Sequence, residues 1–364
     1  MTRYHDLDAL RSFAMLLGIA LHASVFLLPV DFWPVQDEWA RTVPLAENPY
    51  AYLISMIHGF RMPVFFLLSG FFTAMLWRSR GVRRLARHRL KRIGLPLAVC
   101  ALTIVPVTAW LFEPGEFDLA RWPLAWLDGL HHLWFLWYLL LLAGAFIVAV
   151  QFPVRFRSTW WWLLIPLTLW PQHLMVEVGI GADNPAEGVL PTPHLLGYYA
   201  VFFFFGVFFF QRGIAVRSWW AGALPVALVM VLPAALAMLY PELFLDGNPR
   251  WAPVAASILE TSYAWLMCLG LMGLFRWVAS KERFWIRYLS DASYWLYVAH
   301  LPLVVLFQEL VLNWPINVHV KYVLICAAVV GLLLAAYQFG VRYTAVGTML
   351  NGPRVRRPAA RAPG

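Results

Sequence analysis

Runs of about twenty mostly apolar residues recur along this chain, and they constrain its fold more than any other feature. A helix rises about 1.5 Å per residue, so a run of roughly twenty residues crosses the hydrocarbon core of a bilayer. The chain is 62% hydrophobic and only 13% charged, whereas the apolar share of globular domains is about 45–50%. We therefore expect an all-α, polytopic bundle of transmembrane helices.

Windows of that length predict about ten spans, which we assign to one membrane-embedded domain, residues 1–349. Proline occurs in several windows and is tolerated, because neighbouring helices can satisfy the backbone groups that it frees. The short segment 350–364 is basic and rich in Pro and Ala, which predicts a disordered tail. The predicted spans cover residues 7–30, 50–77, 92–112, 133–151, 159–177, 195–211, 217–240, 253–276, 287–312 and 320–345.

Lys and Arg concentrate in every second loop, notably in 78–92 and 276–287, whereas the alternate loops, such as 31–47, carry most of the Asp and Glu. Cytoplasmic loops of membrane proteins are enriched in Lys and Arg. We therefore expect both termini in the cytoplasm. The net charge of +9 then describes one face of a membrane protein, so nucleic acid is not expected as a partner.

The first span carries an aligned set of ionisable residues. At about 100° per residue, the eleven steps from Arg11 to His22 make roughly three turns, so both lie on one helix face about 16 Å apart. Asp8, one turn before Arg11, shares that face. An ionisable residue inside a membrane is a functional-site hypothesis by default.

The basic run 78–92 has two compatible interpretations. It fixes topology by lying against anionic headgroups. Alternatively it docks a phosphorylated cofactor, because Arg84 precedes Arg87, and Arg89 precedes Arg92, by one helical turn. Guanidinium groups spaced in that way suit bidentate contacts with phosphate.

The second span also contains polar residues with two possible roles. His58 and Arg61 lie one turn apart near the outer boundary, where they either reach the headgroups or serve a site. Ser69 and Gly70 lie deeper, where small residues commonly mark a close contact between helices.

Five motifs in a fixed order extend over nearly the whole chain, and together they resemble acyltransferase family 3, a family of integral membrane enzymes. His58-Gly-Phe-Arg61-Met further resembles the branch that succinylates osmoregulated periplasmic glucans. The five motifs are Leu7-Asp8-Ala-Leu-Arg11 with His22, Phe65-Phe66-Leu-Leu-Ser69-Gly70-Phe71, Arg89-Leu-Lys-Arg92-Ile-Gly-Leu-Pro96, His132-Leu-Trp134-Phe135-Leu136 and Ser293-Tyr-Trp-Leu-Tyr-Val-Ala-His300-Leu-Pro302.

The resemblance implies transfer of an acyl group from cytoplasmic acyl-CoA, either succinyl-CoA or acetyl-CoA, to hydroxyls of a carbohydrate on the periplasmic side of a bacterial inner membrane. Succinylation of a glucan is the favoured reaction, and no metal is expected. O-acetylation of another surface glycan is the close alternative. A transporter of a small anion or lipid-linked sugar, or a catalytically silent regulator, remains open.

Within that reaction, His22 is the expected general base, because an imidazole with a pKa near about 6.5 can take up and return a proton. Arg11 and Asp8 are the expected supporting charges. Arg84, Arg89 and Arg92 are expected to bind the cofactor, and Ser69 to donate a hydrogen bond to it.

The remaining candidates are expected to bind substrate, and each keeps an alternative. His58 and Arg61 face the outer solvent. His132 and Trp134 either bind the acceptor or anchor the fourth span at the interface. His300 and Glu260 either line the same cavity or make contacts within the bundle.

Overall fold

The computed structural model describes residues 4–115, 118–152, 159–175, 188–230 and 252–354. Helices form the regular structure of these residues, and no strand occurs among them. This follows from the apolar sequence, because a helix satisfies its own backbone hydrogen bonds where water is absent. The α-helices are α1 His5–Val25, α2 Pro49–Arg89, α3 Leu95–Phe112, α4 Trp134–Ala149, α5 Leu164–Leu167, α6 Leu169–His173, α7 Pro193–Gln211, α10 Ala252–Val278, α11 Phe284–Val311, α12 Val318–Ala336 and α13 Ala345–Asn351.

Seven helical stretches of the described residues are long and apolar enough to cross a membrane. The longest, Pro49–Phe112, has 64 residues and contains both α2 and α3, which the π-helical turn Leu90–Gly94 joins. It bends at Gly81, whose φ of +75° suits a residue without a side chain. The all-α prediction is confirmed. The number of spans stays a prediction, since this one stretch is long enough for two crossings.

Two predicted spans are not single long helices in the described residues. The segment 159–177 contains the short helices α5 and α6, of 4 and 5 residues. Pro166 and Pro171 explain the interruption, because proline lacks the backbone N–H that continues a helix. The predicted span 217–240 begins as a helix over Ser218–Met230, and its remainder lies outside the described residues.

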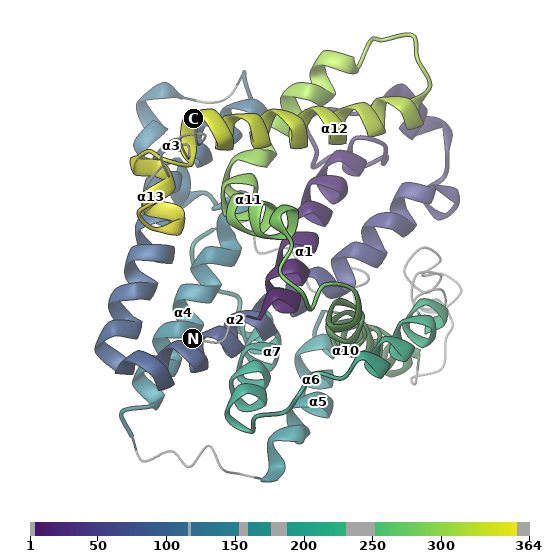
Figure 1. The fold of residues 1–364 in the computed structure, drawn as a ribbon. Helices are drawn as coiled ribbons and strands as arrows, with labels where there is room; N and C mark the ends of the chain where they lie inside the picture. Colours follow the sequence, from purple (N-terminus) through teal and green to yellow (C-terminus); the bar gives the residue numbers. More distant parts are fainter. Residues whose placement is uncertain (1–3, 116–117, 153–158, 176–187, 231–251, 355–364) are drawn as a thin grey trace, which may run out of the picture.

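Helix α1 lies in the middle of the bundle, packed against α2, α10, α11 and α12 (Figure 1). Helices α2 and α7 cross closely. A Cβ on Gly70 would collide with the backbone carbonyl of Phe203, and a Cβ on Gly206 with that of Leu67. Both glycines therefore let two backbones touch, as small residues do between membrane helices.

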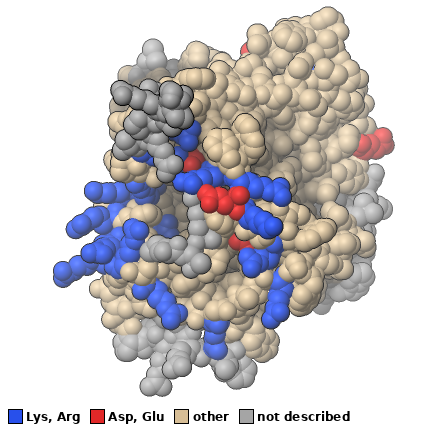
Figure 2. Space-filling view, in the orientation of Figure 1, with Lys and Arg blue, Asp and Glu red and all other residues tan. Residues whose placement is uncertain are grey.

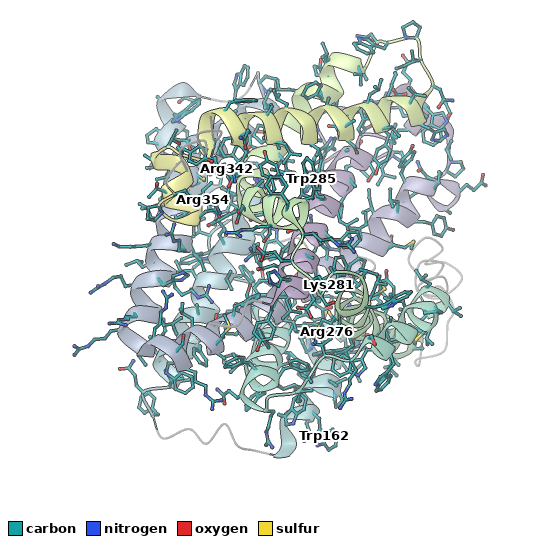
Figure 3. The ribbon with its side chains drawn as sticks, in the orientation of Figure 1. Trp162, Arg276, Lys281, Trp285, Arg342 and Arg354 are labelled. Atoms are coloured by element: carbon teal, nitrogen blue, oxygen red, sulfur yellow. The ribbon has the colours of Figure 1, made fainter. Side chains whose placement is uncertain are left out.

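The first and last described parts of the chain lie at one end of the bundle, which we name the basic end. Near the N-terminus, Asp6 pairs with Arg276 at the end of α10 (3.5 Å), and near the C-terminus Arg354 pairs with Asp291 of α11 (2.6 Å). The short α10–α11 connection joins these two places. Figure 2 shows many basic side chains on one face, and Figure 3 labels Arg276 near the end of α10 and Lys281 in this connection. The exposed basic residues of the α2 end and the connection include Arg78, Arg80, Arg83, Arg84, Arg87, Arg276, Lys281, Arg283 and Arg287.

The opposite end of the bundle, named the far end, is closed by polar contacts of the loop 26–48. Asp37 and Lys321 form a buried ion pair of 2.7 Å. Asn48 caps the start of α2 by accepting a hydrogen bond from the Tyr50 N–H (2.9 Å). The placement of the basic end in the cytoplasm stays a prediction, as does the single domain over 1–349. In the predicted tail, α13 continues to Asn351, and residues 355–364 lie outside the described part.

Candidate functional site

Three histidines from distant parts of the chain meet beneath the far end. His22 of α1, His132 in the turn before α4 and His300 of α11 have ring centroids 5.2 Å apart for His22–His300 and 5.0 Å for His132–His300. His132 and His300 are buried, whereas His22 is partly accessible. In the part of the chain that the structure describes, no His, Cys, Asp or Glu group could hold a metal ion.

Backbone carbonyls fix the tautomers of two of these rings. Pro302 has no N–H, so the Val298 carbonyl one turn earlier has no helical partner, and His132 Nε2 donates to it (3.2 Å). His300 Nδ1 donates to the Tyr297 carbonyl (2.7 Å). His132 Nδ1 and His300 Nε2 therefore keep bare lone pairs. Both atoms are buried and have no hydrogen-bond partner among the described residues.

A buried glutamine holds His22 in place. Gln308 of α11 donates from Nε2 to the backbone carbonyls of His22 (3.1 Å) and Ala23 (3.3 Å). Its Oε1 accepts a hydrogen bond from the Trp33 indole (2.9 Å), and the Trp33 ring stacks on His22 with centroids 5.9 Å apart. One side chain thus fixes the end of α1 and the indole that stacks on the His22 ring.

Two residues of α2 complete the surroundings of His22. His58 and Arg61 lie close enough to it to interact electrostatically, as do His132 and His300. Four of the six residues expected to bind substrate are therefore gathered around the expected base. Their roles stay predictions.

The turn that carries His132 is strained. His131 has a φ of +45°, the one positive value among the described residues other than glycine. Residues with a β-carbon rarely adopt this left-handed region, and such strain of about 1–3 kcal/mol is typical of functional sites. Its neighbour His132 is one of the two histidines with a fixed tautomer.

Arg11 and Asp8 lie at the basic end of α1, about 16 Å along the helix from His22. Arg11 donates to Ser290 Oγ (3.2 Å) and lies 3.7 Å from the Asp8 carboxylate. Arg89 of α2 donates to Thr73 Oγ1 and lies close enough to Arg11 to interact with it electrostatically. The Nε atoms of both arginines are buried and have no partner among the described residues. The predicted catalytic set is therefore divided between two positions.

The other two arginines expected at the cofactor differ from Arg89. Arg92 donates to the carbonyls of Thr348 and Met349 at the end of α13, at 2.5 and 3.0 Å. Its guanidinium thus already stabilises a helix end. Arg84 is exposed on the outside of the basic end.

Three further candidates lie away from the imidazoles. Ser69 is half-buried, and its carbonyl accepts a hydrogen bond from Thr73 (2.6 Å). Trp134 packs into an aromatic cluster, with its ring 5.3 Å from that of Tyr199. Glu260 is buried and accepts a hydrogen bond from Gln172 of α6, so it belongs to a separate polar contact between α6 and α10.

Sequence reasoning did not select Tyr297, Gln308, Trp33 or Gly18, although all four contact or position residues of the site. Tyr297 donates to the His132 carbonyl (2.6 Å). Pro302 was a signal only for the contact between His132 and the Val298 carbonyl, because a proline inside a span leaves one carbonyl for another helix to use.

Comparison with known proteins places the chain in a class. Residues 4–338 match the acyltransferase domain family, so the chain belongs to acyltransferase family 3. The predicted family membership is thereby confirmed. No solved structure matches the chain.

Relatives from three Salmonella organisms share the name Glucans biosynthesis protein C. The protein of Salmonella gallinarum is 31% identical over 168 residues, which is 42% of this chain and 41% of that protein. Those of Salmonella paratyphi B and Salmonella heidelberg are each 31% identical over 154 residues, 38% of this chain and 37% of theirs. The match therefore spans about two fifths of these curated relatives.

Proposed function

We propose that this protein is an integral membrane O-acyltransferase of the bacterial inner membrane. It transfers an acyl group, with succinyl favoured, from cytoplasmic acyl-CoA to a hydroxyl of a periplasmic glucan. The observation that carries the proposal is the partly accessible His22 beside two imidazoles that keep bare acceptor nitrogens. The glucan acceptor is supported by the names of the relatives.

The hydrogen-bonding pattern of the site suits an alcohol acceptor. His132 Nδ1 and His300 Nε2 accept hydrogen bonds and have no donor among the described residues. A buried polar atom without a partner costs about 1–3 kcal/mol. A sugar hydroxyl removes this cost when it donates a hydrogen bond to that atom. A carbohydrate carries several hydroxyls, so neighbouring groups can occupy these nitrogens while one is held at His22.

The distance between the arginines at the basic end and the histidines near the far end suits the length of acyl-CoA. Arg11 and Arg89 offer unpartnered guanidinium nitrogens at the basic end, where phosphates stay out of the hydrocarbon. The pantetheine arm then extends along α1 by about 16 Å, the rise from Arg11 to His22. The thioester then lies at the acceptor, while the CoA phosphates and the arginines that bind them stay at the basic end.

The reaction itself is a direct transfer. His22 takes the proton of the acceptor hydroxyl as its oxygen attacks the thioester carbonyl, which forms the ester C–O bond. The C–S bond breaks, and the sulfur leaves with the proton that His22 returns, as free CoA thiol. General-base catalysis of this kind contributes about 10²–10⁴-fold to rate.

The test is acceptor-dependent release of CoA thiol by the purified protein, with unsubstituted periplasmic glucans as acceptor. We expect His22→Ala to lower the rate by about 10²–10⁴-fold. His5→Ala, at the other end of the same helix, should retain activity and serves as the matched control. Full activity of a correctly inserted His22→Ala would refute the mechanism. Movement of substrate without thioester consumption would indicate a transporter instead.

A further inference from the structure

Arg61 carries a charge for which the described protein offers no counter-ion. It lies twelve residues after the start of α2 at Pro49, which is about 18 Å along the helix. Its Nε is buried without a hydrogen bond, and no ion pair to Arg61 exists among the described residues. An unpaired charge inside a bilayer is costly, so such residues usually meet a partner or a ligand.

A glycine determines where this charge lies. The Arg61 guanidinium packs directly against Gly18 of α1, where a Cβ would collide with Nη1 and lie 3.4 Å from Cζ. Gly18 precedes His22 by four residues, a rise of about 6 Å on nearly the same helix face. The missing side chain at residue 18 therefore lets a cation lie one helical turn from the expected base.

The groups around Arg61 do not neutralise it. Tyr199 and Tyr297 lie close enough to interact with its charge, and the Tyr297 hydroxyl already donates to the His132 carbonyl. His22, His132 and His300 are neighbouring imidazoles. This part of the site therefore favours an anion that the protein does not supply.

A dicarboxylic acyl group is long enough to have its thioester carbonyl at His22 and its free carboxylate at Arg61. A nucleophile held by His22 lies about 3–3.5 Å from the thioester carbonyl carbon at attack. In a four-carbon diacid the far carboxyl carbon is three C–C bonds of about 1.5 Å further on, or about 4 Å in extended form. That separation is comparable to the one turn between His22 and Gly18, against which the guanidinium lies.

We propose that Arg61, held against Gly18, binds the free carboxylate of a dicarboxylic acyl group and thereby selects such donors over neutral ones of equal length. This inference rests on the proposed acyl transfer at His22. It makes Arg61 a residue that determines acyl specificity, through a charge-assisted contact. Gly18 acts through Arg61 as a positioning residue.

The test compares succinyl-CoA with butyryl-CoA, which has the same chain length and no carboxylate, and uses unsubstituted periplasmic glucans as acceptor. Wild-type protein should show the higher kcat/KM with succinyl-CoA. Arg61→Gln should lower kcat/KM for succinyl-CoA by about 100-fold or more, and change that for butyryl-CoA by less than about threefold. Gly18→Ala should shift the ratio in the same direction, whereas Gly144→Ala in α4, where a Cβ meets nothing within 4 Å, should not.

A second measurement separates recognition from a structural role. Because Arg61→Gln removes an unpaired charge, the melting temperature of the ligand-free variant should equal or exceed that of wild type. A lower melting temperature would mean that the guanidinium has a structural partner, which overturns the proposal. An equal loss with both donors would also overturn it, since Arg61 would then act on the reacting carbonyl, while acyl transfer itself would stand. If wild-type protein released no thiol in an acceptor-dependent way from succinyl-CoA and none from butyryl-CoA, the proposed function itself would be refuted.

Discussion

The crossing of α2 and α7 gives the sharpest test of the packing. We predict that Gly206→Ala lowers stability, because a Cβ there would lie 2.9 Å from both Leu67 C and Phe71 N. The nearest atom to that Cβ is the Leu67 carbonyl oxygen, which would lie closer still. Ordinary contacts are about 3.5–4.0 Å, so the two helices must separate locally by more than about 1 Å.

The cost follows from that separation. A gap of about 1 Å forfeits about half of each contact's attraction, which is about 0.1–0.2 kcal/mol per atom pair. Over the roughly 40–60 contacts of one large buried side chain, the loss is about 2–6 kcal/mol. Relaxation of the neighbours brings overpacking costs to about 1–3 kcal/mol in practice, which corresponds to a fall of several degrees in melting temperature.

Gly197→Ala is the matched control, because it lies on the same helix α7 and a Cβ there meets nothing within 4 Å. It should leave the melting temperature in detergent unchanged or raise it, since Ala favours a helix over Gly by about 1 kcal/mol. The double variant Gly70→Ala/Gly206→Ala should cost less than the sum of its parts, because both changes require the same separation. Equal melting of Gly206→Ala and Gly197→Ala would contradict the close crossing.

Three further predictions concern the far end and the site. Asp37→Asn should destabilise the protein by about 3–5 kcal/mol, because the buried Lys321 ammonium loses its counter-ion. Thermal melting should show that adding Lys321→Met recovers much of the loss. His131→Gly should match or exceed wild type in melting temperature and His131→Val should fall below it, since φ is +45° there; equal values would show that the turn is unstrained. Gln308→Leu should cost about 1–3 kcal/mol by leaving the Trp33 indole unsatisfied and should lower CoA thiol release; unchanged melting and release would contradict its role in positioning.

Sequence alone predicted those features that depend on helix geometry. The apolar runs predicted an all-α bundle, and the spacing of Arg11 and His22 predicted two polar positions on α1, because a helical period fixes both. The five motifs predicted the family, which the match over residues 4–338 confirms. A close contact between helices was one interpretation of Ser69 and Gly70, because small residues are common at such contacts, and the structure places Gly70 against Phe203.

Contacts between helices distant in sequence could not be predicted in that way. The pairing of His132 with the Val298 carbonyl depends on how α11 packs beside the turn before α4. Arg92 has the spacing of a phosphate-binding residue, yet its guanidinium bonds to α13. Charge spacing on one helix does not indicate whether a ligand or a neighbouring helix end provides the partner.

The hydrogen bond from Gln308 to the His22 carbonyl joins residues 286 positions apart, which has a consequence for biosynthesis. At about 5–20 residues per second, translation of the intervening chain takes roughly 15–60 s. During that interval α1 has left the ribosome while α11 does not yet exist. The first helix therefore reaches the membrane before Gln308 can bond to the His22 carbonyl and before Ser290 can accept a hydrogen bond from Arg11. A truncation before α11 should leave α1 poorly retained and exposed to proteolytic quality control.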